Sequence, residues 1–139
     1  MDKANHSLIF PPVYYHPPIS SDEVLRRYQA GERYFQRADL AGGSSLASVV
    51  LAGSDFKGSF LSEVDFRHAD LRGVCFDESN VKLSDFRNAI LTDASFRNAA
   101  LCSAMFAGAT LDGVSVENAT WYGALVTDIR KLAEGEPSK

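Results

Sequence analysis

Large apolar side chains recur at every fifth residue through most of the chain, from Leu46 to Val126. Two residues before each of them stands a small side chain, always Ala, Ser or Val. A five-residue period makes no stripe on a helix, which advances about 100° per residue. In a straight strand, an odd period would send successive large residues to opposite faces. The pattern therefore predicts short extended segments that bend every five residues and point each large side chain toward one axis.

Seventeen large residues form this series without a break, and all of them are predicted core residues. They are Leu46, Leu51, Phe56, Leu61, Phe66, Leu71, Phe76, Val81, Phe86, Leu91, Phe96, Leu101, Phe106, Leu111, Val116, Trp121 and Val126. A narrow core filled by its own side chains leaves no interior for a substrate, because ligand pockets need a concavity of several hundred cubic ångströms. Any binding must then use the outer walls, the ends or the tails.

In the best-formed units the residue before the large one is Asp or Asn and the residue after it is Arg or Lys, and the last position is often Gly. Gly, Asn and Asp tolerate tight or left-handed bends. The units 69–73 (Ala-Asp-Leu-Arg-Gly), 84–88 (Ser-Asp-Phe-Arg-Asn) and 109–113 (Ala-Thr-Leu-Asp-Gly) resemble the pentapeptide repeat, A-(D/N)-L-x-x. The resemblance covers roughly residues 33–128. It implies an all-β solenoid, a right-handed quadrilateral β-helix with four units per coil and about five coils.

Four units per coil would stack residues twenty apart, so that Phe66, Phe86 and Phe106 share one column. The triplet Ala-Asp-Leu at 38–40 also matches the repeat, but its leucine lies six residues before Leu46. One extra residue is therefore expected in the Gly-Gly region at 42–43, as a bulge or loop.

The flanking segments differ in composition from the repeat. Residues 1–19 form a Pro/aromatic N-terminal arm, with four of the five prolines, whereas 33–128 form the β-helix without proline. A capping helix is expected over 20–32, where Ser20 is a plausible N-cap and Glu23 its capping-box partner. A short C-terminal capping helix and tail are expected over 129–139. Helices at both ends would cover strand edges that otherwise invite association.

The N-terminal arm leaves two alternatives open. Its apolar stretch, which includes Tyr14 and Tyr15, either packs on the solenoid or offers a Pro-aromatic peptide to a partner. It lacks the basic start, continuous apolar run and cleavage site of a signal peptide.

The composition of the chain limits the kinds of partner that it is expected to bind. At 139 residues the chain is one domain, and its net charge of −4 disfavours nucleic-acid binding. No stretch approaches the roughly 20 apolar residues of a membrane span. Cys75 and Cys102 fall on different walls of neighbouring coils, too far apart for a disulfide, and are expected to be free thiols in a reducing cytoplasm.

The charged residues suggest structure rather than catalysis. Asp65, Arg67, Asp85 and Arg87 stack one coil apart, as either a carboxylate pair or, as we expect, an ion-pair ladder. No catalytic or phosphate-binding motif and no metal-ligand spacing occurs. The chain is therefore predicted not to be an enzyme and to use no cofactor or metal.

Several apolar side chains occupy outward positions. Phe60, Leu83, Ile90 and Met105, with Tyr14 and Tyr15 of the arm, are the candidate interaction surface. The leading hypothesis is a non-enzymatic protein-interaction module with an unknown partner, as a monomer or homodimer. The resemblance adds an alternative, since some family members mimic DNA and bind DNA gyrase, giving inhibition or quinolone protection. The outer walls carry both acidic and basic residues, and the expected solenoid is only about 24 Å long. Both features fit a DNA mimic poorly. A structural part of a larger assembly is the third possibility.

Overall fold

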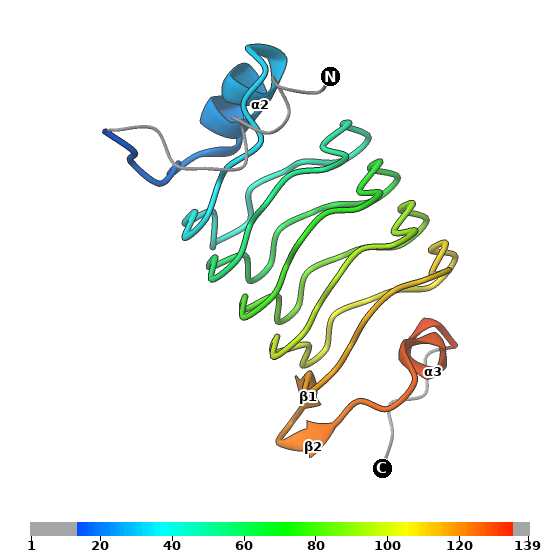
Figure 1. Ribbon diagram of the computed structural model, residues 1–139. Helices are drawn as coiled ribbons and strands as arrows, with labels where there is room; N and C mark the ends of the chain where they lie inside the picture. Colours follow the sequence, from blue (N-terminus) through cyan, green and yellow to red (C-terminus); the bar gives the residue numbers. More distant parts are fainter. Residues whose placement is uncertain (1–13, 135–139) are drawn as a thin grey trace.

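A computed structural model describes residues 14–134 and shows a stack of coils with a helix at each end (Figure 1). Helix α2 (Ser21–Gln29) precedes the coils. Strands β1 (Thr120–Trp121) and β2 (Ala124–Leu125) and helix α3 (Ile129–Ala133) follow them. Within the coils, strand pairing is confined to single parallel bridges, because each extended segment is only a few residues long.

The chain turns a corner once in every five residues. Two residues after each large residue from Leu46 to Trp121, the backbone has a positive φ. At one such corner the amide of Ser54 donates to the carbonyl of Leu51 at 3.1 Å, and Gly53 between them has φ 77°. A single positive φ at the third position of a four-residue turn defines a type II turn. Four such corners complete a coil, since the bridges join residues twenty apart.

The first coil is one residue longer than the others. Tyr34 bridges to Asp55 and Asp39 to Phe60, both 21 residues apart, whereas Ser45 bridges to Asp65 at a spacing of 20. The extra residue lies in the turn that contains Gly42 and Gly43, whose φ angles are 97° and 99°. The bulge expected in this region is therefore confirmed.

The core is a column of stacked side chains. The first thirteen large residues of the series, Leu46 through Phe106, have no exposed surface. Phe86 stacks on Phe66 at 5.0 Å between ring centroids and on Phe106 at 5.1 Å, with nearly parallel planes. It also meets Phe76 from the opposite column edge to face at 5.7 Å. Both geometries are favourable for aromatic rings and add to the free energy of burial.

The C-terminal coil departs from the predicted pattern. Leu111, Val116 and Trp121 are only partly buried, and Val126 is 6% exposed, because the coil is not continued past Thr120. The series therefore overestimates the regular β-helix, which was expected to extend to residue 128.

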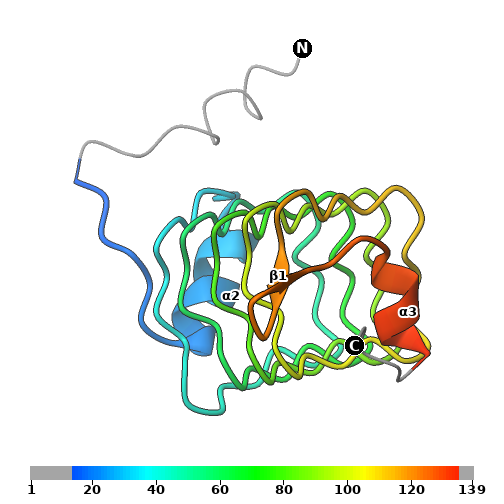
Figure 2. The same ribbon diagram turned by 90° about the horizontal axis from the view of Figure 1, so that it is seen from below.

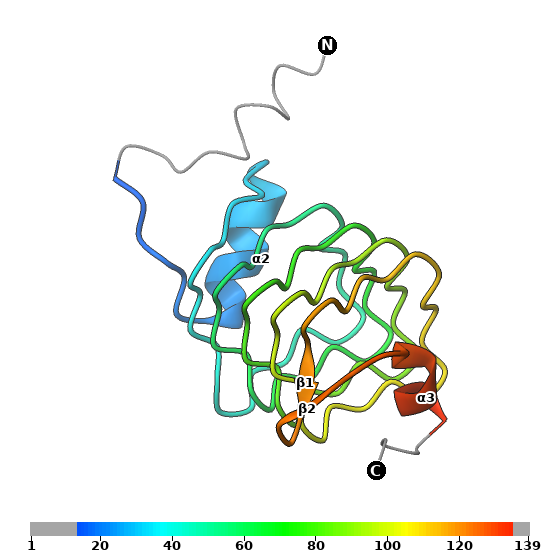
Figure 3. The ribbon, with the colours of Figure 1, turned by 60° about the horizontal axis from the view of Figure 1, so that its bottom comes forward.

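A hairpin turn explains where the coil stops. Tyr122 and Gly123 both have positive φ, 50° and 84°, so the turn is type I′ rather than type II. A type I′ turn reverses the chain, and β2 therefore pairs antiparallel with β1 instead of forming the next wall. The chain then crosses the end of the last coil to reach α3 (Figures 2 and 3).

The two helices lie at opposite ends of the stack (Figure 1). Ser20 caps α2 by accepting from the amide of Glu23 at 3.1 Å, and Val24 of this helix is fully buried. The phenol of Tyr28 donates to the carbonyl of Ala52 at 2.8 Å, which ties α2 to the coils. In α3 the side chains of Ile129 and Leu132 are buried. Helix α2 is shorter than the span of 20–32 that the sequence predicts.

The described part of the N-terminal arm packs on the first coil. The phenol of Tyr15 donates to the carbonyl of Gln36 at 2.6 Å, and its ring meets that of Tyr34 edge to face. The amide of Asp39 donates to the carbonyl of Pro18 at 2.9 Å. Tyr14 is 85% exposed. Residues 1–13 lie outside the described residues, so the choice between packing and partner binding stays open for them.

We expect Phe86→Ala to lower the free energy of unfolding by about 3–5 kcal/mol, because it leaves a cavity among four phenylalanine rings. Phe60→Ala removes the same atoms from a side chain that is 56% exposed and should cost below about 1 kcal/mol. Chemical denaturation of both variants measures the difference. Equal losses in the two variants would contradict the assignment of the core.

Candidate interaction surfaces

The coils present four outer walls, which we name by the consecutive bridge residues of one coil. Each wall is a column of bridged residues one coil apart. The Asp65 wall continues through Asp85, the Asp70 wall through Ile90, the Cys75 wall through Ser95 and the Asn80 wall through Ala100. Because these backbone groups already pair within the stack, the walls can bind partners only through side chains.

The Asp65 wall carries an ion-pair ladder. The guanidinium of Arg67 donates to both carboxylate oxygens of Asp65 at 3.0 and 2.8 Å, and Arg87 binds Asp85 in the same way. Arg67 also lies 3.7 Å from Asp85, one coil away. Hydrogen bonds from the arginines hold the pKa of Asp65 and of Asp85 below the usual range. Both carboxylates are thus ionised and paired, as the ladder hypothesis expected, rather than arranged as an acid and a base.

The Asn80 wall differs from the others in charge. Between Phe60 and Gly123 its outward positions include only two charged residues, Glu63 and Lys82. The Cys75 wall has six at the matching positions, which are Asp55, Lys57, Asp77, Glu78, Arg97 and Glu117. Interface cores are depleted in charge and enriched in aromatic residues. The Asn80 wall is therefore the wall best suited to burial against another protein.

A groove of about 410 Å³ runs across three coils of the Asn80 wall. It is lined by the small side chains of Ala100, Cys102 and Thr120, with the exposed Leu83 and Tyr122 at its rims. The charged Lys82 also lines it, next to Leu83. Leu83 is 49% and Tyr122 71% exposed.

Tyr122 is held in place at the rim of this groove. Its phenol shares a hydrogen bond of 2.7 Å with the hydroxyl of Ser103, and its amide donates to the sulfur of Cys102 at 2.9 Å. The groove thus has a floor of small side chains and a positioned aromatic rim.

The backbone conformation at Leu83 is unfavourable for a leucine. It stands at a corner with φ 63°, in the left-handed region that glycine, asparagine and aspartate enter more readily than leucine. Other corners of the coils use such residues, for example Asn88 and Asp93. An exposed leucine at this position stabilises neither the turn nor the core, which directs attention to its outer surface.

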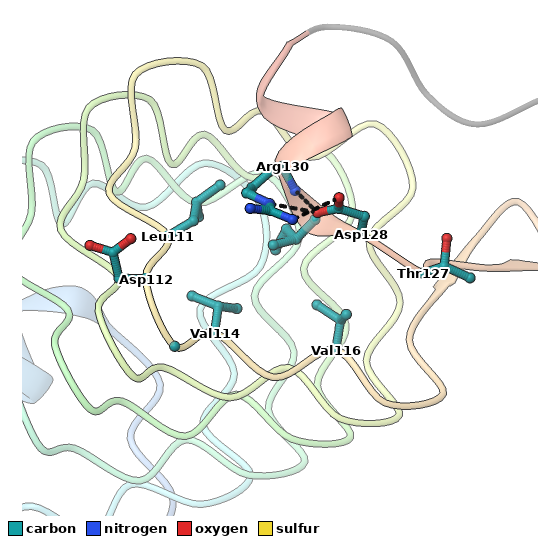
Figure 4. Close-up of a pocket in the computed structure, with 9 residues that line it drawn as sticks. Leu111, Asp112, Val114, Val116, Thr127, Asp128 and Arg130 are labelled. Atoms are coloured by element: carbon teal, nitrogen blue, oxygen red, sulfur yellow. Dashed lines mark hydrogen bonds and ion pairs between the residues drawn. The ribbon is translucent and has the colours of Figure 1, made fainter.

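A second groove lies at the C-terminal end, between the last coil and α3 (Figure 4). It measures about 320 Å³ and is lined by the partly buried Leu111 and Val116. Three charged residues line it, Asp112, Asp128 and Arg130, and the last two bind each other, with Arg130 Nε 3.0 Å from Asp128 Oδ1. Asp128 also accepts from the amide of Arg130 as the N-cap of α3. The charges of Asp128 and Arg130 therefore already have partners within the chain, whereas Asp112 forms no ion pair among the described residues.

The candidate surface predicted from sequence does not form one patch. Phe60 and Leu83 lie on the Asn80 wall, Ile90 on the Asp70 wall and Met105 on the Asp65 wall, while Tyr14 and Tyr15 lie at the N-terminal end. Tyr15 is already engaged by the first coil.

Sequence reasoning missed Tyr122 and the small residues Ala100 and Cys102. The twenty-residue period places these positions in one column. A count of the charged residues in each column would have identified the Asn80 wall. A search for isolated exposed apolar residues does not.

Cys75 and Cys102 are free and lie on different walls. Burial raises the pKa of the Cys75 thiol to about 12, which leaves it unreactive near neutral pH. Among residues 14–134, no three His, Cys, Asp or Glu side chains gather as a metal site would require. None of the helices described is both long and apolar enough to cross a membrane.

The ion-pair ladder predicts a pH-dependent loss of stability. Asp85→Asn removes the charge but keeps a side-chain oxygen that can accept from the backbone amide of Arg87. Asn80 accepts from the amide of Lys82 in this way. The folded pKa of Asp85 lies below its unfolded value, so its charge stabilises the fold at neutral pH and stops doing so as the pH falls through the folded pKa.

We therefore expect Asp85→Asn to lower the free energy of unfolding by about 0.5–1 kcal/mol at pH 7. The gap from wild type should shrink as the pH falls below about 4. Denaturant titrations across this range measure the gap. Asp93→Asn is the control, because Asp93 has no ion pair among the described residues. A gap for Asp85→Asn that does not change with pH would contradict the ladder.

Comparison with known proteins identifies the family of the chain. The family "Pentapeptide repeats" matches residues 44–82 and 83–118, in eight copies. No curated protein matches the chain. Among solved structures, the fold is similar to the pentapeptide repeat protein Rfr23 from the cyanobacterium Cyanothece 51142, at 23% identity and TM-score 0.60, over 65% of each chain.

Two further structures are similar. QnrB1, a plasmid-mediated fluoroquinolone resistance protein, matches at 19% identity and TM-score 0.58 over 62% of this chain and 44% of its own. The protein alr5209 from Nostoc PCC 7120 is 30% identical over 85% of this chain and 96% of its own, with TM-score 0.46. The chain thus spans less than two thirds of Rfr23 and of QnrB1. It belongs to the pentapeptide repeat family.

Proposed function

We propose that the protein is a non-enzymatic interaction module that binds a protein partner through the Asn80 wall. The observation that carries this proposal is the groove between Leu83 and Tyr122 on the least charged wall of the solenoid. Burying this wall would remove few charges from water, so the desolvation cost of binding is low. Exposed tyrosines are frequent binding hot spots.

The rigidity of the coils supports the same function. The groove spans three coils whose amides and carbonyls pair with the neighbouring coils, for example Asn80 with Ser59 and Ala100 with Ser79. A surface fixed in this way pays little ordering entropy when a partner binds. Among the described residues no three His, Cys, Asp or Glu side chains gather as a metal site would require, and the proposed interaction role requires no metal.

Several finer features belong to the same proposal. We take the solenoid to be right-handed with about five coils, and α2 and α3 to act as caps that shield its ends from association. Nucleic acid is not the expected ligand, since the net charge is −4. A cytoplasmic location and a monomeric or dimeric state are further expectations. A place in a larger assembly is compatible with binding through one wall.

Binding to DNA gyrase is the second candidate, favoured by the structural similarity to QnrB1. A DNA mimic needs a surface of consistently negative charge, whereas Arg67, Arg72 and Arg87 stand among the acidic residues of two walls. A gyrase supercoiling assay, with and without a quinolone, decides between the candidates. We expect neither inhibition nor protection at micromolar protein, and either effect would favour the gyrase candidate.

The interaction module predicts that a negative charge at the groove of the Asn80 wall weakens partner binding. Leu83→Asp places an unpaired carboxylate at the groove rim, and aspartate suits the left-handed backbone there, so the fold should be retained. Affinity for the partner recovered from the source cell should fall at least about tenfold. Ile90→Asp is the matched control, since it adds the same charge to an exposed apolar position on the Asp70 wall.

Quantitative pull-downs compare the wild type and the two variants, and thermal melts verify folding. Loss of binding in Ile90→Asp, with binding retained in Leu83→Asp, would assign the interaction to another wall.

A further inference from the structure

We propose that the edge of the Cys75 wall in the last coil, residues 114–118, binds an extended segment of a partner protein in which a large apolar residue is followed by Lys or Arg. The segment adds to the stack as one more parallel strand. This inference goes beyond the proposed function, because it concerns the C-terminal end of the solenoid and not the Asn80 wall.

Within the stack, the backbone of the Cys75 wall pairs from coil to coil. The amides of Phe96 and Asn98 donate to the carbonyls of Ser115 and Glu117 at 2.8 and 2.9 Å. In return, the amide of Ser115 donates to the carbonyl of Ala94 at 3.1 Å. Two donors and one acceptor of each segment therefore point toward the following coil.

The last coil has the same groups with no strand beyond them. The amides of Val116 and Asn118 and the carbonyl of Val114 have no backbone partner among residues 14–134. An exposed strand edge of this kind can pair with another chain. Extended residues in the register that Ser115 to Glu117 take on the coil before would supply one amide and two carbonyls, which satisfies all of these groups.

Other edges of the solenoid are closed by extended backbone of the chain itself. At the first coil, the amide of Asp39 donates to the carbonyl of Pro18 at 2.9 Å. At the last coil, the amide of Val126 donates to the carbonyl of Ala119 at 2.9 Å, next to the Asn80 wall. Extended backbone is thus the form in which the ends of this solenoid are covered.

The edge also has room for a large apolar side chain. Val114 and Val116 are only partly buried, whereas Ala94 and Phe96, one coil earlier in the same columns, are fully buried. A pocket of about 320 Å³ lies between these valines and the start of α3 (Figure 4). A phenylalanine or leucine in the middle of the bound segment would continue the inward column and fill this space.

The charges of the wall specify the next residue of the segment. Basic and acidic side chains alternate one coil apart at a single outward position, through Lys57, Asp77, Arg97 and Glu117. Arg97 Nε lies 3.7 Å from Glu117 Oε1. Glu117 is the last member of the column, so Lys or Arg in the added strand would face an opposite charge, as favourable cross-strand pairs do.

The alternative occupants match the edge less well. A second copy of the protein would bring its own Glu117 to the edge, which adds a like charge. Residues 135–139 of the chain, Gly-Glu-Pro-Ser-Lys, contain no large apolar residue. A partner segment with an apolar residue before a basic one meets both requirements.

Titration of the isotope-labelled full chain with a synthetic peptide tests the proposal. The peptide has blocked ends and the sequence of residues 94–99, Ala-Ser-Phe-Arg-Asn-Ala, which places arginine directly after phenylalanine. NMR follows the backbone amides of Val116 and Asn118 at the edge. The amides of Phe96 and Asn98, which are paired within the stack, are the internal control.

We expect the signals of Val116 and Asn118 to shift and to saturate at millimolar peptide, while those of Phe96 and Asn98 stay in place. A peptide that carries Phe96→Ser should bind at least about tenfold more weakly, because it loses the apolar side chain.

A charge swap locates the basic residue of the peptide. Glu117→Lys in the protein should weaken binding of the peptide about twofold to fivefold, as expected for an exposed ion pair. It should strengthen binding of a peptide with Arg97→Glu by a similar factor. Glu78→Lys is the matched control, since it makes the same substitution at an exposed position of the same wall, two coils away, and should change neither affinity.

Four results would overturn the proposal. The signals of Val116 and Asn118 could fail to respond to the peptide, or Glu117→Lys could leave the preference for arginine over glutamate unchanged. Signals of these amides that shift on dilution without peptide would assign the edge to a second copy. Slow hydrogen exchange at these amides that becomes fast in a chain ending at Glu134 would assign it to residues 135–139. Leu83→Asp should leave the titration unchanged, so this proposal and the proposed function fail separately.

Discussion

The structure depends on a backbone that enters the left-handed region once in every five residues. Each such corner lets the next extended segment start a new wall, and it turns the large side chain of every unit inward. Where the corner has this form, as at Gly53 or Asn88, the coil continues. Where two residues with positive φ form a two-residue turn, at Tyr122 and Gly123, the coil ends in a hairpin. One backbone angle per unit therefore governs the core, the walls and the length of the solenoid.

Because the core is filled by its own side chains, a partner can bind only at the outer surface of the solenoid. The large residues are stacked so tightly that phenylalanine rings lie 5.0–5.9 Å apart within their columns. The same stacking fixes each outward residue against those one coil away. Charges are therefore numerous in some columns and few in others, which gives the Asp65 wall its ladder and leaves the Asn80 wall with one acidic and one basic residue. Differences between walls, rather than a cavity, carry the functional information.

Much of this could be predicted from the sequence. The five-residue period sufficed for the core from Leu46 to Phe106, because a chain that bends every five residues points that whole series inward. The change of spacing before Leu46 located the extra residue in the first coil. Columns twenty residues apart correctly stacked Asp65 on Asp85 and Val50 in line with Ile90.

The end of the solenoid and the groove could not be predicted in the same way. Trp121 and Val126 continue the period although the coil stops at Thr120, since the hydrophobic pattern does not report whether Tyr122 takes a negative or a positive φ. The groove arises partly from that hairpin, because Tyr122 and Gly123 form one end of it. An exposed leucine at position 83 stands out only once the left-handed backbone beneath it is known.

The most direct test of the central claim compares the four walls within one coil. A photoreactive amino acid is placed in turn at positions 87, 92, 97 and 102, which are equivalent positions on the Asp65, Asp70, Cys75 and Asn80 walls. Irradiation in the source cell should yield an adduct with a partner protein from position 102 alone. An adduct from position 87, 92 or 97, with none from position 102, would contradict the assignment of recognition to the neutral wall.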